Sequence, residues 1–360
     1  MKKPTILIIA VLLSLTAIAQ NPSLDNSLSY LDSIIANCQR LQQMAFDYRS
    51  QKDYAKSNEC LREIIKSYPL IGWGDMIDKP QYIIGMNHVD SLTDLAKSYK
   101  TEKNYIKSNE CYEQILVELQ SLEGFEELAT KVKNSIALNH VAMGHASLKK
   151  NVYEDALHHY MTAVEYAIPN SETHKMALRG VGNTYSRQVT NMKFNHLLSN
   201  DDIETAVNYC LTAEHYFDLA SATENRLKEQ ATRAGLLNDL NRTDEALSLY
   251  HQIVNECERD SAYNGLRGNV FFNLGEIYTD KEQFKDAIEY LEQGYVICIT
   301  VDDKQTAYWA AKKLATIYDS QIPNLEKLTL WNRRADELES EIPTMEEVLQ
   351  QIKDKKQNGN

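Results

Sequence analysis

The chain has 360 residues and a formal net charge of −13, and it is 43% hydrophobic and 25% charged. This composition is typical of a globular protein and excludes an intrinsically disordered chain. The acidic balance argues against general nucleic-acid binding, which needs a basic face, and against an anionic membrane surface as the main partner. Only 13 Gly and 7 Pro are present, which favours a mostly helical chain.

Residues 1–19 are predicted to be a secretory signal peptide. Lys2 and Lys3 precede the apolar run Ile6–Ala19, which ends in the small-x-small site Ala17–Ala19. The run is shorter than a membrane span, so we expect cleavage before Gln20 rather than an uncleaved anchor. The junction resembles secretory signals of Bacteroidota, and no Cys follows it to carry a lipid. We expect an exported mature chain without a membrane span, periplasmic or secreted.

Residues 268–294 carry the clearest structural pattern, two short amphipathic helices joined by a tight turn. Apolar and small residues share one face of each helix at helical spacing. They are Phe271, Leu274, Gly275 and Tyr278 at i, i+3, i+4 and i+7, then Phe284, Ala287, Leu291 and Gly294 at i, i+3, i+7 and i+10. Small residues are expected where the two helix axes approach closely; these are Gly275, Ala287 and Gly294. The β-branched segment Tyr295–Val301 is expected to continue the second helix.

An internal duplication supports a repeat protein. Residues 52–60 read KDYAKSNEC and residues 103–111 read KNYIKSNEC, so seven of nine positions match. The order of an aromatic residue, Leu-Gly, Tyr, Ala and a large apolar residue is similar to the tetratricopeptide repeat (TPR) pattern. The pattern recurs at about 38–69, 89–122, 137–170, 175–220, 227–260, 268–301 and 308–340.

This resemblance implies an all-α fold, a TPR helical-hairpin solenoid of about seven repeats coiled as a right-handed superhelix. Residues 20–37 are expected to form an N-terminal helical cap or an extension of the first helix, the array to span 38–340, and residues 341–360 to form a flexible tail. Residues 70–88 and 186–200 are interpreted as inserted connections. Asp201 with Glu204 resembles a capping box, and Thr243 is the expected N-cap of its helix.

The cysteines and histidines form no pattern that indicates a catalytic or metal site. The six cysteines are expected to be buried small hydrophobes, because equivalent repeat positions lie too far apart for a disulfide. His140 and His145 lie on different helix faces, and the adjacent pair His158–His159 diverges too. We therefore expect no cofactor, no metal and no enzymatic activity.

The TPR resemblance implies that the first helix of each repeat lines a concave surface. The register places Arg49, Val141 and Glu276 there, and also a mainly basic set: Lys97, Lys100, Lys149, Arg179, Asn183 and Arg187. The last three follow one another at i, i+4 and i+8 on one helix face. One hypothesis is that repeats two to four hold an acidic or C-terminal peptide segment. The alternative is an ordinary solvated helix face.

The sequence therefore predicts a non-catalytic protein-interaction scaffold or adaptor of the cell envelope that binds a peptide or protein segment in its groove. One alternative is a ligand- or glycan-binding envelope protein, or an enzyme, built on helical repeats. A second is a truncated relative of a TPR-containing sensor or regulator. A closed, aromatic-lined cavity would favour the first alternative, and an open basic groove would favour peptide binding.

Overall fold

The computed structural model describes residues 22–120, 124–194, 199–343, 347 and 354, and in these residues every regular element is a helix. The predicted all-α fold is confirmed. The signal peptide and most of the predicted tail lie outside the described residues. No described helix is both long and apolar enough to cross a membrane. The chain divides into two compact units, unit 1 up to Asn139 and unit 2 from His140, and each is considered separately.

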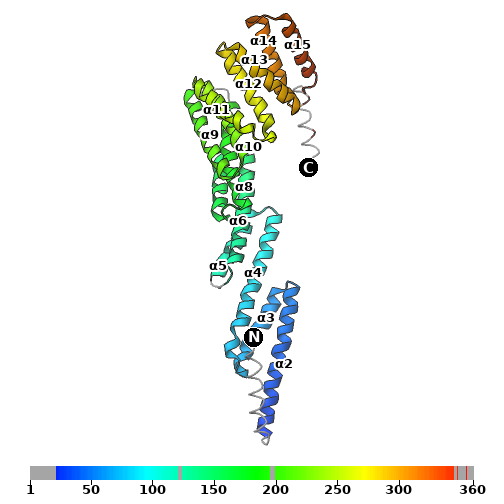
Figure 1. The fold of residues 1–360 in the computed structure, drawn as a ribbon. Helices are drawn as coiled ribbons and strands as arrows, with labels where there is room; N and C mark the ends of the chain where they lie inside the picture. Colours follow the sequence, from blue (N-terminus) through cyan, green and yellow to red (C-terminus); the bar gives the residue numbers. More distant parts are fainter. Residues whose placement is uncertain (1–21, 121–123, 195–198, 344–346, 348–353, 355–360) are drawn as a thin grey trace. The chain divides into compact units, whose positions relative to one another are not determined.

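Unit 1 contains two helical hairpins and the first part of a third (Figure 1). Its helices are α2 (Pro22–Ser50), α3 (Tyr54–Ser67), α4 (Asp78–Thr101), α5 (Tyr105–Gln120) and the beginning of α6 (Glu126–Lys149). Helix α2 packs on α3, and α4 packs on α5. The stretch 20–37, considered as a separate cap or an extension, belongs from Pro22 onwards to the continuous helix α2.

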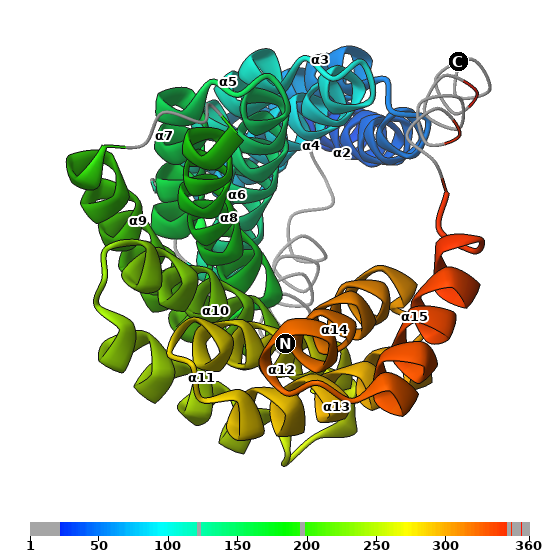
Figure 2. The same cartoon turned by 90° about the horizontal axis from the view of Figure 1, so that it is seen from above.

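Unit 2 continues the array with helices α7 (Tyr153–Tyr166), α8 (Glu172–Phe194), α9 (Asn200–Leu219), α10 (Thr223–Asp239), α11 (Thr243–Cys257), α12 (Asn264–Asp280), α13 (Phe284–Thr300), α14 (Lys304–Thr316) and α15 (Leu325–Glu339). Together with α6, these make five hairpins, and with the two complete hairpins of unit 1 the described part of the chain contains seven, as the repeats predict. In unit 2, α10 contacts α12 and α12 contacts α14. Helices α10, α12 and α14 are each the first helix of a hairpin, and Figure 2 shows them on the inner side of this part of the array.

One backbone turn recurs between consecutive helices. In each case a residue with φ near +60° follows the helix, and the next N–H bonds to the carbonyl five residues earlier, as in Gln283 N to Tyr278 O at 2.9 Å. This is the six-to-one bond of a Schellman motif. The left-handed residues are Lys52, Lys103, Asn151, Ser221, Asn241, Glu282 and Asp302. None of them is glycine, which agrees with the low glycine content.

The glycines instead serve helix packing. A Cβ placed on Gly275 would lie 2.5 Å from Leu291 Cγ, and one on Gly294 would lie 3.2 Å from Gly268 O. The close approach of α12 and α13 that the small residues predict is therefore confirmed. Helix α13 runs to Thr300, so the β-branched segment from Tyr295 is helical up to that residue.

The duplicated nonapeptide joins neighbouring hairpins in unit 1. Asn87 Nδ2 donates hydrogen bonds to Ser57 Oγ at 3.0 Å and to Asn58 Oδ1 at 2.7 Å, while Ser57 Oγ donates to Ala45 O at 2.9 Å. Corresponding contacts recur one repeat later, in residues Asn139, Ser108, Asn109 and Ala96. We call each set an Asn clasp. It fixes the register of one hairpin on the next, because a shift would leave buried polar atoms unpaired.

The connection predicted over 70–88 is wrong in its length. Two short 3₁₀ turns, Tyr68–Ile71 and Gly74–Met76, lead into α4, which begins at Asp78. Pro80 is tolerated because the first N–H groups of a helix have no partner within it. The Trp73 ring packs against that of Tyr68, with the two centroids 5.8 Å apart.

The insertion predicted over 186–200 is mostly helix, so that prediction is also wrong. Helix α8 continues to Phe194 because Val189 is buried in the core, where Met192 packs beside it. The capping box also differs from the prediction. Ser199 is the N-cap, and Asp202 completes the reciprocal pair.

The N-cap of α11 is Arg242 and not Thr243, which is the first helical residue. The Thr243 hydroxyl instead donates to Asn238 Oδ1 at 3.0 Å. All six cysteines are free and buried, as predicted from their repeat positions.

Candidate interaction surface

Helix α8 presents a short polar ladder, defined here as Arg179, Asn183 and Arg187. Asn183 and Arg187 are exposed and Arg179 is partly exposed, while the opposite face of α8 is buried. Arg179 Nη2 pairs with Glu172 Oε1 on the same helix. Among the described residues, neither Asn183 nor Arg187 has a side-chain hydrogen bond or ion pair. The ladder therefore combines one paired cation with an amide and a cation available to a ligand.

Two glycine contacts hold α8 between its neighbours and so position the ladder. A Cβ on Gly180 would lie 2.4 Å from the ring of Tyr160 in α7, and one on Gly182 would lie 2.7 Å from the ring of Phe217 in α9. Both rings are almost fully buried. The backbone of α8 thus lies directly on two large aromatic side chains, and its outer face has a fixed orientation.

A buried carboxylate joins α8 to α10 beside the ladder. Ser186 Oγ donates to Glu229 Oε2 at 2.7 Å, and Glu229 is only 4% exposed. Burial raises the pKa of the Glu229 carboxyl. Next to it, Arg233 holds Glu214 with two hydrogen bonds of 2.6 and 3.0 Å. No sequence motif pointed to Glu229, because in the sequence it cannot be told apart from the many acidic residues expected on helix surfaces.

The raised pKa of Glu229 predicts a pH-dependent stability. Below the unfolded pKa the carboxyl is protonated in both states, so its contribution is fully present there. As the pH rises through the folded-state pKa, the buried group ionises and stability is lost. The free energy of unfolding of Glu229→Gln, relative to that of the native chain, should therefore increase from pH 5 to pH 7.5 by on the order of 1–3 kcal/mol. Urea unfolding at both pH values measures this, and a difference independent of pH would contradict it.

The comparisons with known proteins identify the repeats. Residues 268–295 and residues 41–70 each match a model of the tetratricopeptide repeat. The first match covers most of the α12–α13 hairpin, and the second covers the end of α2 with α3. The chain is a tetratricopeptide repeat protein. The TPR resemblance drawn from the sequence is confirmed, and TPR arrays are protein-interaction scaffolds, so this coarse class of function applies here.

Solved TPR structures are similar to the chain at low identity. YrrB, titled a TPR protein with an unusual peptide-binding site, is 18% identical with a TM-score of 0.32, covering 61% of this chain and 90% of its own. A Rap protein complexed with Competence and Sporulation Factor is 14% identical with a TM-score of 0.37, and the match covers 86% of this chain and 77% of the Rap chain. A STAND protein with a TPR sensor from Pyrococcus horikoshii is 12% identical with a TM-score of 0.42, and the match covers 82% of this chain and 46% of the STAND chain. The comparison with curated proteins returned no match.

The other basic positions of the predicted TPR groove divide between the two units. Lys97 and Lys100 lie on α4 in unit 1, where Lys97 is exposed and Lys100 is half-buried. The pKa of the Asp94 carboxyl is lowered chiefly by its hydrogen bond from Lys52. The charge of the nearby Lys97 lowers it to a smaller degree. Lys149 is exposed in the last turn of α6, in unit 2. We therefore restrict the candidate surface to the ladder on α8.

Several positions that the TPR register assigns to the groove are used internally. Arg49 Nη2 pairs with Asp90 Oδ2 at 2.7 Å, joining α2 to α4. Glu276 Oε1 pairs with Lys313 Nζ at 3.0 Å, joining α12 to α14. Val141 is buried at 3% exposure, so its assignment to the surface is wrong.

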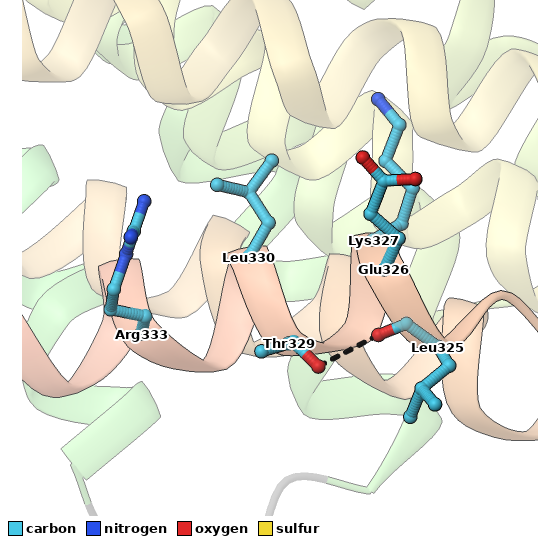
Figure 3. Close-up of a pocket in the computed structure, with 6 residues that line it drawn as sticks. All are labelled: Leu325, Glu326, Lys327, Thr329, Leu330 and Arg333. Atoms are coloured by element: carbon cyan, nitrogen blue, oxygen red, sulfur yellow. Dashed lines mark hydrogen bonds between the residues drawn. The ribbon is translucent and has the colours of Figure 1, made fainter.

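A hollow of about 730 Å³ lies along α15 (Figure 3). The side chains of Glu326, Lys327, Leu330 and Arg333 point to the same side of this helix, and the hollow is lined by residues of α15. Lys327 lies 3.8 Å from Glu292, and Arg333 lies 3.8 Å from Glu337. This is an open, single-helix surface, and it is not the closed aromatic cavity that an enzymatic or glycan-binding reading would need.

The histidines are less scattered than the sequence suggests. His140 of α6 and His159 of α7 lie together, with their Nδ1 atoms 3.3 Å apart. Burial, followed by the neighbouring histidines, lowers the pKa of His140 to about 4, and burial also lowers the pKa of His159. Helix-face arguments within one helix missed this pair because its members come from two helices.

Proposed function

We propose that this TPR protein is a non-catalytic interaction module of the cell envelope that binds an extended, acidic segment of a partner protein on the α8 ladder. The single observation that carries the proposal is the exposed ladder itself, in which Asn183 and Arg187 have no side-chain partner among the described residues. The acidic composition of the chain makes a basic ladder on one fixed helix notable. The signal-like N-terminus supports export; finding Gln20 as the first residue of the envelope protein would test it.

The spacing of the ladder specifies the shape of its ligand. Residues four apart on an α-helix are separated by about 6 Å along the axis. Alternate residues of an extended peptide are separated by about 6.6 Å. A peptide lying along α8 can therefore place carboxylates four residues apart against Arg179 and Arg187, while Asn183 contacts the peptide backbone between them. Charge-assisted hydrogen bonds of this kind are stronger than neutral ones.

Glu172 acts as a competitor for the ligand in this arrangement. It is exposed and already pairs with Arg179, so an incoming carboxylate replaces it. Because the pair is exposed, breaking it costs little, within about 1 kcal/mol. Arg187, which needs no such exchange, is then the larger contributor to binding.

A crosslinking pull-down with residues 20–360 as bait in envelope extract tests the proposal. The Arg179→Glu/Arg187→Glu variant should lose at least about 90% of the recovered partner, because two attractive contacts become repulsive at a cost of about 1.4 kcal/mol or more. Arg259→Glu/Lys285→Glu is the matched control, since it makes the same charge change at exposed positions of unit 2 away from α8. Equal recovery by all three baits would contradict the proposal.

A further inference from the structure

A groove in unit 2 lies where the α12–α13 hairpin meets the end of α11. It has a volume of about 430 Å³ and is separate from the ladder on α8. Its lining residues are Glu258, Arg267, Phe271, Glu292, Gln293, Val296 and Ile297. The spacing of these residues places those of α12 on one face of that helix and those of α13 on one face of the other. We call this feature the α12–α13 groove.

Part of the α12–α13 groove is apolar. Phe271 is buried and Ile297 is half-buried, and both pack in the core of unit 2. Val296, one residue before Ile297, is 60% exposed. A single exposed apolar side chain is common on protein surfaces. Here the exposed valine lines the same groove as two residues of the core, so a large apolar side chain of a ligand can cover all three at once.

Arg267 brings an unpaired hydrogen-bond donor to the groove. Its Nε atom is shielded from solvent and has no hydrogen-bond partner in the described part of the chain. Its guanidinium forms no ion pair with any described residue. Buried N–H groups in native proteins are rarely left without an acceptor, because an unpaired donor is unfavourable. A ligand in the groove can supply the acceptor that the folded chain does not.

The carboxylates of the groove decide which acceptor is favourable. Glu258 is exposed and its side chain has no hydrogen bond or ion pair within the described ranges, and Glu292 lies 3.8 Å from Lys327. A ligand carboxylate would bring like charge to both acids, which is unfavourable. A main-chain carbonyl carries no net charge, and it is available in an extended segment but not inside a helix. A basic side chain on the same segment can pair with Glu258.

We propose that the α12–α13 groove binds an extended segment of a partner protein in which a large apolar residue lies next to Lys or Arg. The apolar side chain covers Phe271 and Val296, a main-chain carbonyl accepts a hydrogen bond from Arg267 Nε, and the basic side chain pairs with Glu258. Neighbouring side chains of an extended chain point to opposite sides, so the basic residue stays at the exposed rim. This surface selects the opposite charge to the ladder and goes beyond the proposed function.

Selection of phage-displayed random dodecapeptides on the chain 20–360 tests the groove. We expect enriched peptides with a large apolar residue next to Lys or Arg. Fluorescence anisotropy then measures the affinity of the most enriched synthetic peptide. Val296→Glu, Glu258→Lys and Arg267→Met should each weaken binding by at least about tenfold, because each removes one of the three contacts. The ladder variant used in the pull-down should bind this peptide as the native chain does.

Val117→Glu and Glu110→Lys are matched controls, because they make the same changes at exposed positions of α5 in unit 1. Both should bind the peptide as the native chain does, and circular dichroism of each variant separates loss of a contact from loss of the fold. The absence of any enriched peptide, or equal binding by folded Val296→Glu, would overturn the proposal. Enrichment of acidic peptides alone would also overturn it, and loss of those peptides by the ladder variant would at the same time support the proposed function.

Discussion

Replacing Gly180 by alanine is expected to destabilise unit 2 by about 3 kcal/mol, although the same change in most helices is favourable. The added Cβ would lie 2.4 Å from the ring of Tyr160, which is completely buried and cannot move without disturbing α6 to α8. Gly144 of α6 lies against the same ring, with a Cβ distance of 2.8 Å. Urea unfolding of the full chain measures the change in the free energy of unfolding.

Gly265→Ala is the matched control for this prediction. Gly265 lies in α12 of the same unit, and nothing lies within 4 Å of its Cβ position. The substitution should stabilise the protein slightly, by up to about 1 kcal/mol, through helix propensity. Combining Gly180→Ala with Tyr160→Leu should recover part of the loss, because the two side chains compete for one space. Equal effects of the two glycine substitutions would show that Tyr160 does not restrict α8.

Asn139→Ala is expected to destabilise unit 1 by about 2–4 kcal/mol. Asn139 Nδ2 donates to Ser108 Oγ at 2.9 Å and to Asn109 Oδ1 at 2.8 Å, and all three residues are buried. The substitution leaves Asn109 without its donor and opens a small cavity. Thermal and urea unfolding of the full chain measure the loss in the free energy of unfolding.

Two further variants make the Asn139 prediction specific. Asn87→Ala removes the equivalent clasp and should lose a similar amount of stability, because its contacts with Ser57 and Asn58 repeat the same arrangement. Gln114→Ala removes an exposed amide from α5 and should change stability by less than about 0.5 kcal/mol. A loss of that small size for Asn139→Ala would contradict the structural role of the clasp.

The hairpins could be predicted from the sequence because their apolar positions follow helical spacing. Gly275, Ala287 and Gly294 indicated where helices approach, and their contacts agree. The helix ends could not be predicted as well. Local turn signals such as Gly72, Gly74 and Gly85 suggested a long connection, yet Gly85 lies inside α4. Tertiary burial extends a helix through residues that would end it in isolation.

The turns show a second limit of local reasoning. A left-handed residue after each helix usually indicates glycine, but this chain places residues such as Lys52, Asn241 and Glu282 there. The left-handed conformation costs a non-glycine residue about 1–2 kcal/mol. The hydrogen bonds of the turn and the packing of both helices offset that cost. Because the residue types differ from turn to turn, the sequence carries no common signal for this position.

The candidate site was only partly predictable. The spacing of Arg179, Asn183 and Arg187 was sufficient to place them on one face of α8, because that argument needs only helical geometry. Contacts between helices were not accessible in this way. The pairing of His140 with His159 and the burial of Glu229 depend on which helix faces meet. Sequence spacing within one helix contains no information about either contact.

Site-specific photo-crosslinking from Asn183 tests the central claim most directly. A photoreactive residue at position 183 contacts whatever lies on the ladder, and the same residue at Lys285, exposed on α13, serves as the control position. We predict a covalent adduct with one partner protein from position 183, mapping to an acidic segment, and none from position 285. An adduct from position 285 alone, or none from either position in envelope extract, would contradict a protein partner bound on α8.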